Sequence, residues 1–258
     1  MNTLKISIIQ TALAWEDAIA NRAAFTELIA VTDKDTDLVI LPEMFATGFT
    51  MNPGAVAETM KGDTVAWMVK TAQAKQCAIT GSLVIEEGGK YYNKLFFVFP
   101  DGTMKTYNKR HLFTYADEHK HYTAGKEKLI VDYKGWKICP LVCYDLRFPV
   151  FSRNTEDYDL LLYVANWPQV RTAAWDALLK ARAIENMSYT IGVNRIGEDG
   201  NGHAYAGHSQ VLDALGNYIT EPQRTMGVFT AILDKEILQQ TRNRFSFLND
   251  RDGFTLQD

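Results

Sequence analysis

The chain has 258 residues, a formal net charge of −4, 47% hydrophobic residues and 22% charged residues. These proportions are ordinary for a soluble globular protein, and the slight acidity predicts no nucleic-acid partner. No apolar run approaches the ~18 residues of a membrane-spanning helix, so no membrane partner is expected.

The N-terminal segment can be interpreted as a strand or as a signal peptide. Its apolar run at 6–9 loosely resembles a signal peptide, but Gln10 and Thr11 interrupt the run and only Lys5 precedes it. We therefore predict a first strand at 4–10, and with it a cytoplasmic protein.

The remaining elements follow from the spacing of the apolar residues. The near-helical spacing of Ile19, Phe25, Leu28 and Ile29 predicts an amphipathic helix over 17–31. Further helices are expected at 64–75, 172–187 and 235–240. Further strands are expected at 38–41, 78–85, 91–99, 104–108, 128–133, 136–142, 160–164, 189–194, 209–213, 217–220 and 228–233.

The order of these elements predicts the fold class. No linker, low-complexity tract or repeat divides the chain, so we expect one α+β domain over 1–258 with two sheets covered by helices. Pro140 lies inside a predicted strand, where its missing N–H indicates an edge position or a bulge.

The three cysteines are Cys77, Cys139 and Cys143. An odd number is no disulfide framework. Cys139 and Cys143 would lie ~13 Å apart on an extended strand, whereas a disulfide needs Cα atoms within ~7 Å. We expect neither a disulfide nor a shared metal in that segment.

Three predicted strands are each followed by a reactive side chain. Glu43 follows the strand at 38–41, Lys109 follows the strand at 104–108, and Cys143 follows the strand at 136–142. Because ligand sites in α/β architectures gather at strand ends, these side chains could converge.

Together the three side chains would form a thiol-based catalytic site. A neighbouring ammonium favours the thiolate of a cysteine. Glu43 would accept the thiol proton, pass it to a leaving amine and then activate water against the thioester. Lys109, with a backbone N–H such as that of Tyr144, would stabilise the oxyanion.

Each of the three residues also has a plainer explanation when it is taken alone. A cysteine after an apolar run is more often structural than catalytic. Glu43 could cap a helix or lie on the surface, and Lys109, in a basic loop, would usually be solvated.

The segments around the three residues resemble the signature blocks of the nitrilase superfamily of carbon–nitrogen hydrolases. These blocks are Leu41-Pro42-Glu43, Tyr107-Asn108-Lys109-Arg110-His111-Leu112-Phe113 and Val142-Cys143-Tyr144-Asp145-Leu146-Arg147-Phe148-Pro149. Later segments also agree: Asn166-Trp167-Pro168, Trp175 with 178–186, and Gly207-His208-Ser209 with Asp213 and Gly216. The resemblance extends from Ile6 to about Leu233.

The resemblance implies a four-layer αββα sandwich with Cys143 as nucleophile, Glu43 as general base and acid, and Lys109 as oxyanion stabiliser. It implies that Glu118 orients the lysine. It also implies a homodimer, and an enzyme that uses neither a cofactor nor a metal. His111, His119 and His121 form one irregular cluster with no nearby cysteine, which is a poor zinc pattern.

Within the superfamily the chain resembles the bacterial omega-amidase branch, which hydrolyses 2-oxoglutaramate and 2-oxosuccinamate to the 2-oxo acid and ammonia. The segments that carry this resemblance are Leu41-Pro42-Glu43-Met44-Phe45, Thr47-Gly48-Phe49 and Ala116-Asp117-Glu118-His119. The small-molecule substrate would be an anionic amide, so the site should hold a cation.

Arg147 is the nearest candidate for that cation by sequence, with Arg171 and Arg110 behind it. Alternatively, Arg147 forms a structural ion pair with Asp145 or Glu185, because arginine suits both arrangements. The aromatic candidates for the pocket wall are Tyr115, Trp167 and Phe148, although such residues are more often plain core.

Other functions stay open at this level. One is a related activity of the same superfamily, such as a carbamoyl-amine hydrolase or a nitrilase, and an anion requirement in substrate kinetics would separate these from an omega-amidase. Another is a scaffold that keeps the fold without turnover, but a scaffold has no need of Glu43, Lys109 and Cys143 together.

Overall fold

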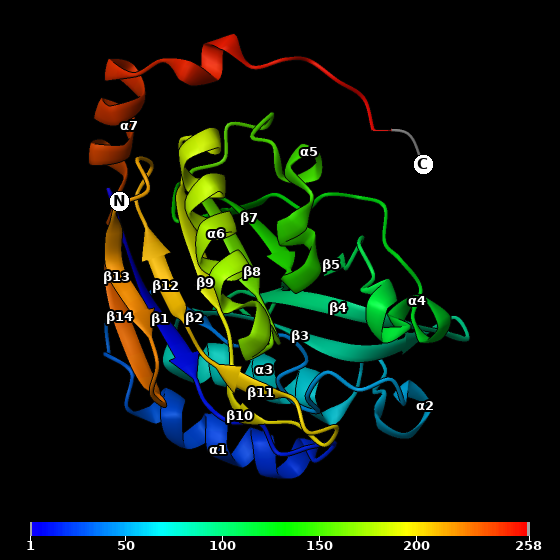
Figure 1. Ribbon diagram of the computed structural model, residues 1–258. Helices are drawn as coiled ribbons and strands as arrows, with labels where there is room; N and C mark the ends of the chain where they lie inside the picture. The colour runs from blue at the N-terminus through cyan, green and yellow to red at the C-terminus, as the bar shows by residue number, and fades with distance from the viewer. Residues whose placement is uncertain (1, 257–258) are drawn as a thin grey trace.

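Two six-stranded mixed sheets form the centre of the molecule in a computed structural model that describes residues 2–256 (Figure 1). The first sheet has the strand order β14-β1-β2-β3-β4-β5 and the second has the order β13-β12-β9-β8-β7-β6. The first sheet contains β1 (Thr3–Gln10), β2 (Leu38–Ile40), β3 (Ala78–Glu87), β4 (Lys90–Val98), β5 (Met104–Asn108) and β14 (Gly227–Asp234). The second contains β6 (Val131–Tyr133), β7 (Trp136–Val142), β8 (Leu160–Val164), β9 (Tyr189–Val193), β12 (Ser209–Leu212) and β13 (Tyr218–Gln223).

Helices and one small hairpin complete the fold. The α-helices are α1 (Ala18–Ala30), α2 (Pro53–Val56), α3 (Asp63–Lys75), α4 (Glu118–His121), α5 (Pro149–Ser152), α6 (Thr172–Asn186) and α7 (Lys235–Arg244). Short 3-10 helices lie at η1 (Thr114–Ala116), η2 (Cys143–Arg147), η3 (Gln169–Arg171) and η4 (Phe247–Asp250). β10 (Ile196–Glu198) and β11 (Ala204–Ala206) pair as a separate two-stranded sheet. None of the helices within 2–256 has the length and apolarity needed to cross a membrane.

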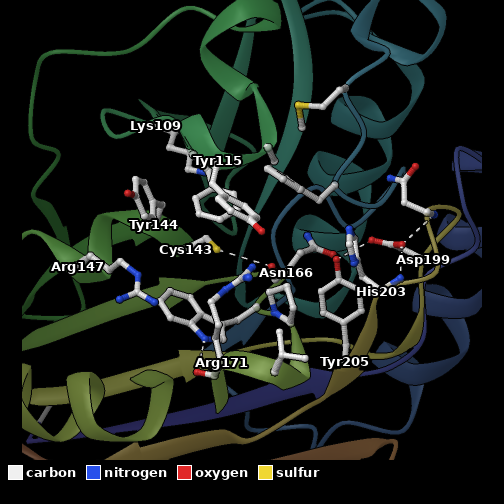
Figure 2. A pocket seen from close by; sticks show the side chains of 18 residues that line it. Lys109, Tyr115, Cys143, Tyr144, Arg147, Asn166, Arg171, Asp199, His203 and Tyr205 are labelled. Atoms are coloured by element: carbon white, nitrogen blue, oxygen red, sulfur yellow. Dashed lines mark hydrogen bonds between the residues drawn. The ribbon is translucent and has the colours of Figure 1, made fainter. Parts of the chain in front are cut away.

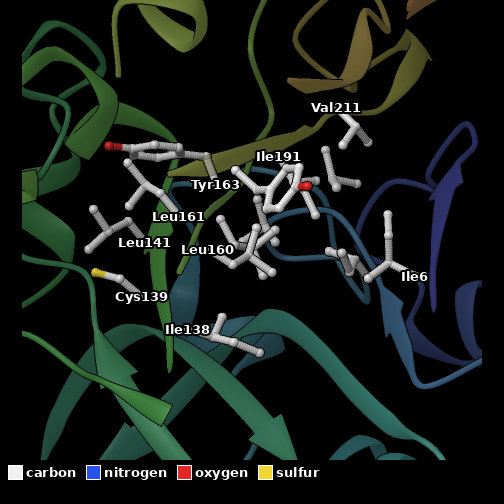
Figure 3. Close-up of a cluster of buried hydrophobic side chains, with 14 of the residues drawn as sticks. Ile6, Ile138, Cys139, Leu141, Leu160, Leu161, Tyr163, Ile191 and Val211 are labelled. Atoms are coloured by element: carbon white, nitrogen blue, oxygen red, sulfur yellow. The ribbon is translucent and has the colours of Figure 1, made fainter. Parts of the chain in front are cut away.

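The inner faces of the two sheets share one hydrophobic core. Ile6 from the first sheet belongs to the same buried cluster as Ile138, Leu160 and Ile191 from the second (Figure 3). Leu38 of the first sheet belongs to this cluster as well. Alternate residues of each strand meet between the sheets because successive side chains of a strand point to opposite faces. The site described below forms at one edge of this shared core.

Helices cover the outer face of each sheet. α1 and α3 pack on the first sheet through residues such as Phe25 and Met68. α6 packs on the second sheet through Trp175 and Leu179. The close approach of α6 to β9 requires the absence of a side chain at Gly192, where an added Cβ would lie 2.4 Å from a Leu179 methyl group. The helix–sheet–sheet–helix order is the predicted αββα sandwich.

Strand direction explains why side chains from both sheets meet. β1, β2 and β3 are parallel, and β5 runs in the same direction as β3 because β3–β4 and β4–β5 are both antiparallel pairs. The ends of β2 and β5 therefore lie at the same edge of the first sheet. In the second sheet β7, β8 and β9 are parallel as well.

Most predicted elements are present, with a few differences. Ile19 is 74% exposed, contrary to the expectation that it shares the buried face of α1. Six residues separate it from Phe25, which turns it to another side of a helix with 3.6 residues per turn. The β10–β11 hairpin and helices α2, α4 and α5 were not predicted. Pro140 occupies a local edge, because β6 pairs with β7 only as far as Ile138.

Candidate active site

The structure joins three of the predicted site residues in one buried ion-pair cluster. The Lys109 Nζ lies 2.9 Å from Glu43 Oε1, and 3.0 and 2.9 Å from the two carboxylate oxygens of Glu118. The side chains of all three residues are fully buried. Burial alone would lower the pKa of Lys109, but the charges of Glu118 and Glu43 outweigh it and raise this pKa. The ammonium therefore stays protonated between two carboxylates.

Main-chain and amide donors hold the two carboxylates in place. Asn93 Nδ2 donates to Glu43 Oε1 at 2.7 Å, and the Phe113 main-chain N–H donates to Glu118 Oε2 at 2.5 Å. Asn166 fixes Glu43 from the second sheet, because its main-chain N–H donates to Glu43 Oε2 at 2.8 Å. Burial raises the pKa of Glu118, while Lys109 opposes that shift.

Cys143 begins the 3-10 helix η2 directly after β7 and joins this cluster from the second sheet. Its φ of +45° lies in the left-handed region, which is strained for a residue other than glycine. The thiol Sγ lies 3.8 Å from the main-chain oxygen of Asn166 (Figure 2). The residue is 9% exposed and lines a cavity, so the strained backbone presents the thiol to that cavity.

The surroundings of the Cys143 thiol act on its pKa in opposite directions. Burial and the negative charge of Glu43 raise the pKa of Cys143 well above its ordinary value, and the opposing charge of Lys109 is too small to reverse this. A hydrogen bond with Glu43 acts in the same direction. The Lys109 ammonium does favour the thiolate, as expected from the sequence, but burial and the charge of Glu43 outweigh it.

Asp145 anchors the turn that carries Cys143. Its Oδ2 accepts the Tyr107 hydroxyl at 2.8 Å and the Val142 main-chain N–H at 3.0 Å. Its Oδ1 accepts the His111 main-chain N–H at 3.1 Å and lies 2.7 Å from His111 Nδ1. Tyr107 and His111 belong to the segment that carries Lys109. Asp145 therefore links this segment to the nucleophile turn, which is the 3-10 helix η2 that begins at Cys143.

A cavity of about 410 Å³ opens onto the thiol. Cys143, Lys109 and Asn166 line its base, and aromatic and apolar side chains line much of its wall. The residues of that wall include Phe49, Met51, Phe113, Tyr115, Tyr144, Trp167 and Tyr205. A cavity of this size and lining suits a small molecule.

Two arginines face this cavity without a carboxylate partner among residues 2–256. Arg147 lies over the Trp167 ring at 5.0 Å, and Arg171 lies 5.2 Å from the Phe113 ring centroid. Asp145 and Glu185, the predicted alternative partners of Arg147, contact other residues instead. The ion-pair alternative for Arg147 is therefore wrong.

Arg110 and Phe148 do not line the cavity, contrary to the expectation that they could. The guanidinium of Arg110 donates to the Lys126 main-chain oxygen at 2.8 Å and lies over the Phe151 ring. Phe148 stacks on the His111 ring, with 3.7 Å between the centroids. Phe148 therefore supports the nucleophile turn from the side.

The other predicted pocket residues do line the cavity. Trp167 is 3% exposed, and its indole N–H donates to the Arg171 main-chain oxygen at 2.8 Å. Tyr115 is 85% exposed and lies at the rim. Tyr144, whose backbone N–H was predicted as an oxyanion donor, lines the cavity next to the thiol.

Sequence reasoning missed several residues of the site. The roles of Asn93 and Asn166 as donors to Glu43 were not predicted, although Asn166 lies in a motif that was noticed. The β10–β11 hairpin was missed altogether, and it contributes Asp199, His203 and Tyr205 to the cavity. Its two short strands carry no alternating pattern long enough to signal a hairpin. No cluster of His, Cys, Asp or Glu suited to a metal occurs within 2–256.

A family comparison decides the class of protein. The carbon–nitrogen hydrolase family model matches residues 5–243. The chain belongs to the carbon–nitrogen hydrolase family. This confirms the resemblance seen in the sequence and, with it, a hydrolase acting on carbon–nitrogen bonds.

Relatives within this family are close in sequence and structure. The omega-amidase YafV of Yersinia enterocolitica is 46% identical over 259 residues, covering 99% of this chain and 100% of that protein. A 2-oxoglutaramate amidase of Bacillus subtilis is 30% identical over 250 residues, covering 95% and 96%. The crystal structure of XC1258 from Xanthomonas campestris, a CN-hydrolase superfamily protein with an arsenic adduct in its active site, is 44% identical with a TM-score of 0.97. It covers 100% of both chains, and the αββα fold class is thus confirmed.

Proposed function

We propose that this chain hydrolyses the ω-amide of a small 2-oxo acid, 2-oxoglutaramate or 2-oxosuccinamate, to the 2-oxo acid and ammonia through a thioester on Cys143. One observation carries the proposal: the cavity that exposes Cys143 beside Glu43 and Lys109 also presents Arg147 and Arg171 without carboxylate partners. Guanidinium groups bind carboxylates well. The names of the omega-amidase and 2-oxoglutaramate amidase relatives support the same substrate class.

The first half of the reaction forms the thioester. Glu43 accepts the thiol proton as Cys143 Sγ attacks the amide carbon, so a separate thiolate never has to exist in the buried site. The carbonyl oxygen becomes an oxyanion that the Lys109 ammonium and the Tyr144 backbone N–H stabilise. Glu43 then gives its proton to the nitrogen, the C–N bond breaks and ammonia leaves.

The second half hydrolyses the thioester with the same groups. Glu43, again a carboxylate, takes a proton from a water molecule that attacks the thioester carbon. The second tetrahedral oxyanion meets the same donors. When the C–S bond breaks, Glu43 returns its proton to the sulfur and the 2-oxo acid leaves. Glu118 takes no proton in this scheme, and it positions the ammonium through contacts to both of its oxygens.

Ammonia release from 2-oxoglutaramate by wild type and by Cys143→Ala tests the proposal. Release by wild type that disappears in the variant supports both the substrate and the nucleophile. If wild type releases none while Cys143 still alkylates faster than Cys77 and Cys139, the substrate is wrong and nitriles and carbamoyl amines come next. If Cys143 shows no selective alkylation, the non-catalytic scaffold is favoured.

A homodimer and a cytoplasmic location belong to the same proposal. Exposed apolar side chains on α5 and α6, Val150 at 52% and Ile184 at 49%, favour association of two copies through these helices. The three free cysteines are typical of a reducing compartment. Light scattering on the purified protein gives the oligomeric state directly, and a monomer at micromolar concentration would contradict the dimer.

A further inference from the structure

A buried arginine without a carboxylate partner lies behind one wall of the cavity. Arg195 is fully buried, and its guanidinium donates to main-chain oxygens: Nε to Ile196 at 3.2 Å, and Nη2 to Glu198 at 2.9 Å and Leu13 at 3.4 Å. Its Nη1 has no hydrogen-bond partner within 2–256. Burial of a charge that no carboxylate neutralises is unfavourable, and the field of such a charge extends to groups nearby.

Tyr205 separates this arginine from the cavity. The guanidinium lies 4.7 Å from the Tyr205 ring centroid, and Tyr205 lines the cavity whereas Arg195 does not. Figure 2 shows Tyr205 and Arg147 on opposite sides of Cys143. Tyr205 is 5% exposed, so its ring keeps water away from the cation.

Asp199 influences Arg195 through its charge, but its hydrogen bonds go to other groups. Asp199 raises the pKa of Arg195, against the larger lowering that burial causes. The oxygens of Asp199 accept the Tyr205 hydroxyl at 2.7 Å and the main-chain N–H groups of Asn201 and His203 at 2.9 and 3.0 Å. Asp199 therefore closes the β10–β11 hairpin, and its hydrogen bonds go to these donors and not to Arg195.

We propose that Arg195 is a specificity-determining residue whose charge, acting across the Tyr205 ring, favours anionic amides over neutral amides of the same length. This inference rests on the proposed function and adds a third cation to Arg147 and Arg171. A substrate carboxylate on the far side of the ring would lie ~9 Å from the guanidinium, and at an effective dielectric constant of ~20 that attraction corresponds to at least about a tenfold change in affinity.

A pair of substrates of equal chain length that differ only in the terminal group tests this proposal. Succinamate carries a carboxylate where butyramide carries a methyl group, so the ratio of their kcat/KM values reports the preference for the anion. Arg195→Met should lower this ratio about tenfold relative to wild type. A purely structural role would lower kcat/KM for both substrates together and leave the ratio unchanged, which would overturn the proposal.

Arg242→Met provides a matched control. Arg242 also donates to main-chain oxygens, those of Met187 and Tyr158 at 2.7 Å each. Unlike Arg195 it also contacts a carboxylate, Asp159 at 3.5 Å, and it does not line the cavity. Arg242→Met should leave the ratio of the two kcat/KM values within twofold of wild type. If the ratio falls as much as in Arg195→Met, the effect comes from the loss of any buried arginine and not from the position of Arg195.

A second pair of variants serves if Arg195→Met does not fold. Tyr205→Ser admits water between the Arg195 guanidinium and the cavity. This water screens the charge, so the ratio of the kcat/KM values for succinamate and butyramide should fall. Tyr205→Phe keeps the ring and should keep the wild-type ratio. Equal ratios in both variants would overturn the proposal. If the wild-type enzyme does not prefer succinamate, the proposed anionic substrate is wrong. If the wild-type enzyme prefers succinamate and Arg195→Met keeps that preference, only the proposed role of Arg195 is wrong.

Discussion

Asn166 holds Glu43 through two hydrogen bonds that join the two sheets. The Asn166 main-chain N–H donates to Glu43 Oε2 at 2.8 Å, and the Asn166 side-chain amide donates to the Glu43 main-chain oxygen at 2.6 Å. Glu43 follows β2 of the first sheet, and Asn166 follows β8 of the second. The position of Glu43 therefore depends on how the two sheets pack.

Removal of the nucleophile should abolish turnover and leave the fold intact. Cys143→Ala removes only a sulfur atom at the edge of the cavity, so we expect no ammonia release and an unchanged circular dichroism spectrum. Cys77→Ala is the control, because Cys77 is buried outside the cavity. Turnover that survives in Cys143→Ala would contradict the thioester mechanism.

Removal of the ammonium should be nearly as damaging. Lys109→Ala leaves the oxyanion without its charged donor, and loss of one such donor typically costs ~3–4 kcal/mol, or about 10²–10³-fold in kcat. It also leaves Glu43 and Glu118 unneutralised, so thermal unfolding should occur at a lower temperature. Lys105→Ala, at an exposed position on the strand that precedes Lys109, should retain wild-type kcat. Equal kcat in the two variants would exclude oxyanion stabilisation by Lys109.

The resting thiol should react slowly with a small neutral reagent at pH 7. The raised pKa of Cys143 means that the thiol keeps its proton through neutral pH, so the thiolate fraction and the rate of mixed-disulfide formation should still be rising above pH 9. Stopped-flow measurement with methyl methanethiosulfonate gives this profile. If the rate instead reaches a plateau with a midpoint below pH 7, the charge of Lys109 outweighs burial and Glu43 in setting the pKa of the thiol.

Asp145→Asn should loosen the nucleophile turn. The amide keeps one acceptor oxygen but places an NH2 group against the donors that the carboxylate now satisfies. We expect a loss of about 2–4 kcal/mol in the free energy of unfolding, and a larger effect on kcat than on KM. Urea unfolding and steady-state kinetics measure both quantities. Wild-type kcat in the variant would mean that the turn is held without Asp145.

The cavity arginines should select the charge of the substrate. Arg147→Met should raise KM for 2-oxoglutaramate about 10–100-fold, because hydrogen bonds to charged groups contribute ~1.5–3 kcal/mol. Glutamine, whose ammonium would approach Arg147 and Arg171, should be a poor substrate. Arg244→Met, at an exposed position on α7, is the control. Efficient hydrolysis of glutamine would contradict this view of the cavity.

The sequence alone predicted much of the fold, because strands and long helices leave local signals. The apolar runs that became β2, β7 and β8 and the Ala- and Leu-rich α6 could be located from spacing and composition. The β10–β11 hairpin could not, since its three-residue strands are stabilised by Asp199 and by packing rather than by a local pattern.

For the site, the sequence by itself singled out Glu43, Lys109 and Cys143 as the candidate catalytic residues, because they follow strand ends and their motifs resemble those of the family. Only the tertiary structure decided their electrostatic state. Burial and the charge of Glu43 raise the pKa of Cys143, and Arg147 and Arg171 face the cavity instead of pairing with carboxylates. The physical reason is that pKa values and ion pairs depend on burial and on neighbours distant in sequence, which no local pattern encodes.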